Sequence, residues 1–235
     1  MMKKLDSLNY KMHFDDPVAH IITLQGHSKS EQLSDRCARS CDDCGQPWVT
    51  WPAFDGTNGD IYYPAHAQNQ EHYMFLKQMN DRLTITEVAT ILSHYSLWAH
   101  CVKTDVPLVV LEHDAIMVKK YAWHDGWNQI NYLGNLQQLQ EGKWPSFPPH
   151  SAATKNYKFI CRAHAYAIDP AVARQLVSHV IRFGLCAPAD MLMRADVFPL
   201  VQTGFYAFDA PDETTITGRD PDWAVHAREI FSTFV

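Results

Sequence analysis

The sequence contains no apolar run that approaches the roughly 20 residues of a membrane-spanning helix. Its first residues include Lys3 and Lys4, but they are not followed by the apolar segment of a secretory signal. An excess of positive charge is missing as well, since 20 Lys and Arg residues face 26 Asp and Glu residues and the net charge is −6. We therefore expect a cytoplasmic protein without an integral membrane segment, whose overall charge mildly disfavours polyanionic partners.

Several functional motifs are also absent. The sequence has no glycine-rich phosphate loop of the Walker or dinucleotide type, no G-x-S-x-G motif and no internal repeat. These absences argue against P-loop ATPases, typical Rossmann dehydrogenases and hydrolases with a nucleophile elbow.

The cysteines do not form a zinc motif. Cys41 and Cys44 have C-x-x-C spacing, but no second pair follows at a finger-like distance. They also fall at the C-terminal end of a predicted helix, where the helix dipole disfavours a thiolate. Because Leu33 and Cys37 precede them at helical spacing, we interpret this face as core packing. We expect reduced thiols at Cys37, Cys41, Cys44, Cys101, Cys161 and Cys186.

With 235 residues, 46% of them hydrophobic, the chain is long enough to bury a substantial core. Residues 1–16 are polar and lack periodicity, so we expect an N-terminal arm followed by a single domain over 17–235. Strand patterns alternate with helical ones, which is typical of an α/β fold with a mostly parallel sheet flanked by helices. Strands are predicted at 18–24, 48–51, 108–111, 128–134 and, as the last one, 198–202. Helices are predicted to begin near Ser28 or Ser30, at Thr84 and at Pro170.

The stretch Leu108–Asp114 is the most informative one, because an apolar run stops abruptly at two carboxylates. The run has the pattern of a strand that is buried on both faces. Ligands of open α/β sheets bind beyond the carboxyl ends of the strands, and alternation places Glu112 and Asp114 on one face with His113 turned away. Such a pair favours a hard divalent cation with oxygen ligands. The alternative is a pair of solvated loop carboxylates.

The order of further motifs resembles glycosyltransferase family 25, which includes lipopolysaccharide and collagen sugar transferases. The resemblance spans residues 18–219, and its motifs stand together at sensible spacing. They are an opening strand, a D-G segment, S-H-x-x-x-W, an acidic strand end, an aromatic A-Y segment and P-x-D, found here at 18–24, 51–56, 93–98, 110–114, 165–168 and 188–190.

This resemblance implies a GT-A-like fold and an inverting transfer of a sugar from a nucleotide-diphosphate donor, with UDP as the expected nucleotide. It implies a divalent cation, Mn²⁺ or Mg²⁺, held by Asp114 and Glu112. It also implies Asp190 as the general base for the acceptor hydroxyl. The residues expected to bind the donor are Thr23, Leu24, Asp55, Ser93, His94, Glu112, His113 and Arg219.

Three of these residues also have simpler interpretations. His94 lies beside the apolar face of its predicted helix, where most polar side chains are merely solvated. Asp190 is placed to serve as the N-cap of a short helix. Arg219, in a polar tail, has the alternative of a solvated arginine.

His113 departs from the family pattern, because it stands where the family has the middle residue of an acidic triplet. Alternation turns His113 away from the metal, whereas an early turn would make it a direct ligand. Two rival functions follow: a transferase-like binding module that has lost metal binding, and a metal-dependent hydrolase that uses Glu112, Asp114 and nearby histidines.

The acceptor has two alternatives. The family suggests a glycan or lipopolysaccharide core. A hydroxymethylated base in phage-type DNA, modified in the host cytoplasm, is the second alternative. The second alternative would draw on cations at the rim of the site, namely Lys119, Lys120, Lys143, Lys155, Lys158 and Arg162.

Overall fold

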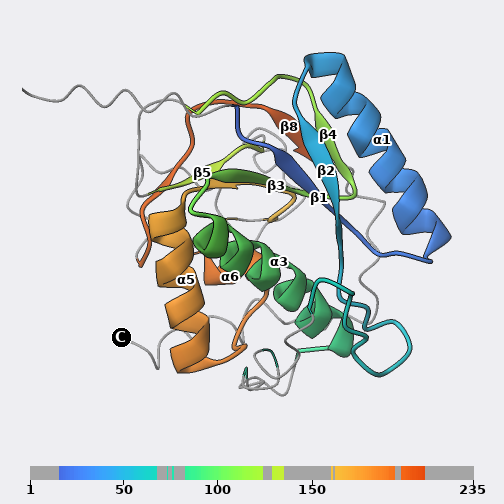
Figure 1. Cartoon of the computed structure of the whole chain (residues 1–235), viewed down its shortest axis with the longest axis vertical. Coiled ribbons are helices and arrows are strands. Elements are labelled where there is room, and N and C mark those ends of the chain that lie inside the picture. The colour runs from blue at the N-terminus through green and yellow to red at the C-terminus, as the bar shows by residue number, and fades with distance from the viewer. Residues whose placement is uncertain are drawn as a thin grey trace, which may run out of the picture.

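A six-stranded sheet with the order β2-β1-β3-β6-β5-β7 forms the centre of the fold (Figure 1). The computed structural model describes residues 16–67, 73, 76, 83–123, 129–134, 160, 162–193 and 197–209. The predicted arm over 1–16 therefore lies outside the described residues, apart from Asp16. The strands of the sheet are β1 (Ala19–Thr23), β2 (Trp48–Pro52), β3 (Leu108–Glu112), β5 (Ile130–Tyr132), β6 (Ala165–Ile168) and β7 (Leu200–Val201).

The sheet is mixed but mostly parallel. Strand β1 pairs in parallel with β2 and β3, and β5 pairs in parallel with β7. Strand β6 runs antiparallel to both of its neighbours, β3 and β5. Helices flank the sheet, and they are α1 (Ser28–Cys44), α3 (Ile85–Thr104), α5 (Pro170–Phe183) and α6 (Ala189–Leu192). This arrangement confirms the predicted α/β fold with a mostly parallel sheet flanked by helices.

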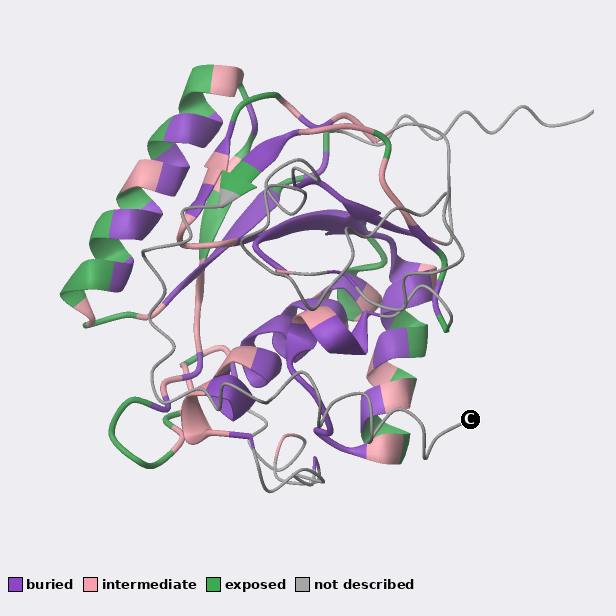
Figure 2. Ribbon diagram, turned by 180° about the vertical axis from the view of Figure 1, so that it is seen from behind, coloured by how far each residue is buried: buried purple, intermediate pink, exposed green. Residues whose placement is uncertain are grey.

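Both faces of β3 are buried, as its unbroken apolar run predicts. Leu108 and Val110 belong to the core shared with α3 and α5, whereas Val109 and Leu111 belong to the core shared with α1. Figure 1 shows α1 on one side of the sheet and α3, α5 and α6 on the other. Figure 2 shows the buried strands, and α1 with a buried and an exposed face.

Local signals define the two long helices. Helix α1 ends at Gly45, whose φ of 72° is left-handed backbone that suits glycine. Helix α3 begins with the predicted capping box, in which Thr84 accepts from the Glu87 amide and Glu87 accepts from the Thr84 amide. The predicted core face of α1 is confirmed for Leu33, Cys37 and Cys41, which are buried, whereas Cys44 at its end is half-buried. None of the described helices is long and apolar enough to cross a membrane.

Strand β8 (Ala207–Asp209) was not predicted. It follows β7, which the sequence indicates as the last strand. It pairs antiparallel with β4 (Ala115–Met117) in a separate two-stranded sheet. Both strands have three residues, too few for an alternation pattern, so the pairing depends on tertiary structure.

The segment that follows β2 is held tightly against α3. The Ser93 hydroxyl accepts a hydrogen bond of 3.0 Å from the Phe54 amide and donates to the Ala89 carbonyl at 2.8 Å. At Gly56, a Cβ atom would lie 2.7 Å from the carbonyl oxygen of Ile85, so only glycine permits this approach. The D-G segment is thus fixed to the first turns of α3.

We predict that replacement of Ser93 by alanine destabilises the protein by about 1 to 3 kcal/mol, because the buried Phe54 amide loses its acceptor. Urea unfolding measures this change. Thr104→Ala is the matched control, since its hydroxyl bonds only to a carbonyl of its own helix and is exposed. We expect the control to change stability by less than about 0.5 kcal/mol. Equal effects of the two substitutions would contradict the anchoring role.

We also predict that acid destabilises the fold through His20. Burial lowers the pKa of His20 to about 4, whereas the unfolded chain binds the proton near its usual pKa of about 6.5. Above about pH 6.5 His20 does not change the free energy of unfolding with pH. As the pH falls from about 6.5 to 4, it lowers the free energy of unfolding by about 1 kcal/mol per pH unit. Urea unfolding of the wild type and of His20→Phe across this range should show a steeper loss in the wild type. Parallel curves would refute the prediction.

Candidate active site

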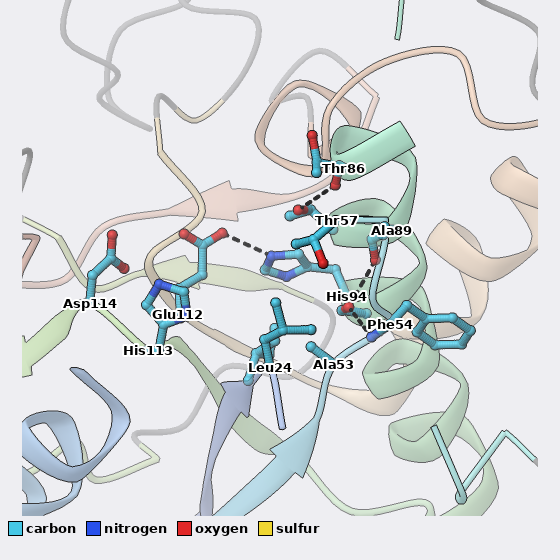
Figure 3. Close-up of a pocket in the computed structure, with 14 residues that line it drawn as sticks. Leu24, Ala53, Phe54, Thr57, Thr86, Ala89, His94, Glu112, His113 and Asp114 are labelled. Atoms are coloured by element: carbon cyan, nitrogen blue, oxygen red, sulfur yellow. Dashed lines mark hydrogen bonds and ion pairs between the residues drawn. The ribbon is translucent and has the colours of Figure 1, made fainter. Parts of the chain in front are cut away.

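A pocket lies beyond the carboxyl ends of β1, β2 and β3 and beside the N-terminal half of α3 (Figure 3). This is the edge where ligands of open α/β sheets bind. One group of its lining residues comes from the strand ends and the segment after β2, and the other group comes from α3. The lining residues are Ile22, Leu24, Ala53, Phe54, Gly56, Thr57, Thr86, Ala89, Thr90, Ser93, His94, Glu112, His113 and Asp114.

His94 and Glu112 form the best-defined polar pair of the pocket. Nε2 of His94 lies 3.0 Å from Oε1 of Glu112. His94 is fully buried, which shows that its interpretation as a solvated residue on the helix flank is wrong. The side chain of Glu112 is 30% exposed and faces the pocket. Because its partner is buried, the carboxylate of Glu112 is held in one position and is not a freely solvated loop carboxylate.

The charge state of Glu112 follows from its surroundings. Burial by itself raises the pKa of this carboxyl, but the hydrogen bond with His94 and the surrounding histidines bring the pKa below its usual value. The backbone amide of Glu112 also donates to the carbonyl of His164 at 2.9 Å. Glu112 is therefore ionised at neutral pH.

His113 points to the opposite side of the sheet. Its Nδ1 lies 3.0 Å from the Ser30 hydroxyl of α1, whereas Glu112 bonds to α3. Burial lowers the pKa of His113; Glu112 raises it in part, and the nearby cations Lys29 and Arg36 lower it further. The lowered pKa favours the neutral form of His113. The residue flanks the pocket.

Asp114 follows the end of β3 and lies in a turn, so strand alternation does not extend to it. It nevertheless lines the same pocket as Glu112. A hydrogen bond with Cys41 and burial raise the pKa of the buried Cys37 thiol, and the charges of Cys41 and of nearby Asp114 raise it further. Figure 3 shows the Glu112 carboxylate between Asp114 and His94.

These two carboxylates fit a divalent cation that is completed by substrate oxygens. Among the residues that the structure describes, no group of three or more His, Cys, Asp or Glu side chains is placed to hold a metal alone. Mg²⁺ and similar ions usually bind through one or two carboxylates together with substrate phosphates. Glu112 and Asp114 supply that number of carboxylates in one pocket.

The structure places two predicted donor residues outside the pocket lining. The Thr23 hydroxyl donates to the Ile21 carbonyl and lies 2.7 Å from the Ser34 hydroxyl of α1. The Asp55 carboxylate accepts from the amide and hydroxyl of Thr57 at 2.8 and 2.7 Å. Asp55 therefore shapes the turn that presents Thr57, while Leu24, Ser93, His94, Glu112 and His113 do line the pocket.

Asp190 lies on α6 and does not line this pocket. Its Oδ2 accepts a hydrogen bond of 3.2 Å from the Arg162 amide. The N-cap of α6 is Pro188, with no side-chain capping bond, so the interpretation of Asp190 as an N-cap is wrong. The segment 162–164 connects the two acids, because Asp190 bonds to its first residue and Glu112 to its last.

Other predicted residues divide between described and undescribed parts of the chain. Lys120 pairs with Asp16, and Lys119 lies over the Tyr206 ring at 5.1 Å. The remaining predicted residues that lie outside the described ones are Arg219, Lys143, Lys155, Lys158 and Cys161.

Sequence reasoning missed two groups of residues. Thr86 and Thr90 line the pocket because they follow the helical spacing of His94 and Ala89, but nothing distinguishes them from solvated threonines in the sequence. The hydroxyl of Tyr166 lies 2.9 Å from Nδ1 of His94. The aromatic motif indicated Tyr166, but the sequence does not show its partner, which is 72 residues away.

Comparison with known proteins identifies the family of this chain. The sequence profile of glycosyltransferase family 25, described as a lipopolysaccharide biosynthesis protein, matches residues 20–193. No curated protein matches the chain in sequence. Among solved structures, the chain is similar to the galactosyltransferase LgtC in complex with donor and acceptor sugar analogues, with a TM-score of 0.48 and 8% identity over 92% of this chain and 95% of that chain.

An active-site mutant of LgtC gives the same values of similarity, identity and coverage. The family match covers most of the chain and includes the strand ends, α3 and the acidic turn that form the pocket. The chain therefore belongs to glycosyltransferase family 25.

Proposed function

We propose that this glycosyltransferase is an inverting, cation-dependent enzyme that uses a nucleoside diphosphate sugar, with UDP as the nucleotide, and that transfers the sugar to a hydroxyl of a glycan. The observation that carries the proposal is that Glu112 and Asp114, two carboxylates from the end of the central strand, line one pocket with His94. A nucleotide diphosphate needs charge compensation at such an edge.

The chain's residues divide the work in this proposal. Glu112 and Asp114 would hold Mn²⁺ or Mg²⁺, and the bound ion would stabilise the negative charge on the departing diphosphate. Ser93 holds the segment after β2 in place through the Phe54 amide. Leu24, Ala53 and Thr57, which line the same pocket, provide the surface for the nucleoside.

The transfer itself is a single displacement. The acceptor oxygen forms a bond to the anomeric carbon while the bond between that carbon and the diphosphate oxygen breaks. The electron pair of the breaking bond leaves with the diphosphate. Asp190 takes the proton of the acceptor hydroxyl. Asp190 lies outside the lining of the pocket that holds Glu112 and Asp114, and an inverting reaction needs its base on the side of the sugar opposite the leaving group.

Two of the described rim cations give no support to a DNA base as the acceptor. Lys120 is paired with Asp16 and Lys119 lies over an aromatic ring. The net charge of −6 disfavours a polyanion as well. A sugar hydroxyl is therefore the acceptor that we propose.

A screen of nucleotide sugars tests the proposal. We predict that one UDP-sugar releases UDP in the presence of Mn²⁺ and that Asp114→Asn lowers kcat/KM by about 100-fold or more, because the site loses a charge that faces the diphosphate. Asp105→Asn is the matched control, since this exposed aspartate precedes β3 at its opposite end. Wild-type activity in Asp114→Asn would refute the cation site.

Two further outcomes identify the rivals. Absence of thermal stabilisation by every nucleotide, with and without Mn²⁺, would favour a binding module that has lost the metal. Release of sugar without an acceptor at the full rate would favour a hydrolase.

A further inference from the structure

A chain of hydrogen bonds leads from the core of the protein to the pocket. Nε1 of Trp98 donates to the Tyr166 hydroxyl at 2.9 Å. That hydroxyl lies 2.9 Å from Nδ1 of His94, and Nε2 of His94 lies 3.0 Å from Glu112. Trp98, Tyr166 and His94 are fully buried, and of these four residues only His94 and Glu112 line the pocket.

The fold brings these side chains together from three elements. His94 and Trp98 are four residues apart on α3, so they share a helix face. Tyr166 of β6 pairs in register with Val110 of β3, two residues before Glu112 on the same face of the strand. The S-H-x-x-x-W motif, the aromatic motif and the acidic strand end thus meet at one point.

The direction of each bond follows from which groups can donate. The indole of Trp98 only donates, and an ionised Glu112 only accepts. Tyr166 therefore accepts from Trp98 and has one proton to give, and burial, the largest influence on its pKa, keeps this hydroxyl protonated. Nδ1 of His94 accepts the hydrogen bond that this hydroxyl donates, so Nε2 carries the N–H that bonds to Glu112.

A doubly protonated imidazole does not fit this arrangement. Nδ1–H would then face the Tyr166 hydroxyl. The proton of that hydroxyl would lose Nδ1 as its acceptor inside the core. Leaving a buried donor without an acceptor costs about 1 to 3 kcal/mol. The opposite neutral tautomer would place a lone pair of Nε2 against the carboxylate.

We propose that Tyr166 and Trp98 are positioning residues, which hold the His94 ring with its Nε2–H toward Glu112 and so keep Glu112 at the pocket with one carboxylate oxygen bonded. Figure 3 shows the second oxygen pointing away from His94, to the side where Asp114 lies. This inference rests on the proposed function, in which Glu112 acts at the donor diphosphate. It assigns a role to residues that do not touch the pocket.

Tyr166→Phe tests this inference, because it removes the hydroxyl and keeps the ring. In histidine-labelled wild type, ¹⁵N NMR should show His94 with a protonated Nε2 and an unprotonated Nδ1. In Tyr166→Phe the signal of Nδ1 should shift to that of a nitrogen that accepts no hydrogen bond, and kcat/KM should fall roughly 10- to 100-fold, the usual effect of losing a partner of a ligating group. The matched control is Tyr121→Phe, which deletes another buried hydroxyl, bonded to Asn131 instead.

The inference is overturned by a wild-type spectrum with Nδ1 protonated, or by an active Tyr166→Phe enzyme with unchanged kcat/KM. If the variant does not fold, His94→Gln and His94→Asn replace it, since Gln offers an N–H near Nε2 and Asn offers one near Nδ1. Gln should retain at least about tenfold more activity than Asn, and equal losses refute the role.

The two proposals fail in different ways. A wild type that turns over no nucleotide sugar contradicts the proposed function. The spectrum decides the direction of the hydrogen bonds whether or not the enzyme turns over.

Discussion

The hydrogen bond between His94 and Glu112 connects the helix on one side of the sheet to the end of its central strand. An acidic side chain that is partly withdrawn from water is unstable without a partner, and the partner here is itself fully buried. The rest of the pocket is arranged around this contact. The position of α3 fixes His94, and the same helix holds the segment after β2 through Ser93.

The same constraint explains why the family motifs have their residue types. Ser93, next to His94, accepts a hydrogen bond from a backbone amide of the D-G segment. The glycine of that segment, Gly56, allows the segment to approach a backbone carbonyl of α3. The tryptophan one turn later donates to the tyrosine of the antiparallel strand. Residues that are distant in sequence thus serve one purpose, which is to hold the acidic end of β3 in a defined place beside a pocket.

The sequence predicted much of this structure because its strongest signals are local. The capping box at Thr84 and the glycine after α1 mark helix ends through their own backbone, and the apolar run before Glu112 marks a buried strand. Side-chain direction was less predictable. Every residue of β1 is buried, so the pattern of that strand does not reveal that Thr23 turns toward α1. The short strand β8 and the bond between Asp190 and the Arg162 amide depend on contacts between distant segments.

The most direct test of the account is a crystal structure of the protein with UDP and Mn²⁺. The account predicts that the diphosphate and the ion lie against Glu112 and Asp114, with the bond from His94 to Glu112 retained. A nucleotide bound in another part of the protein, or a diphosphate held without either carboxylate, would contradict it.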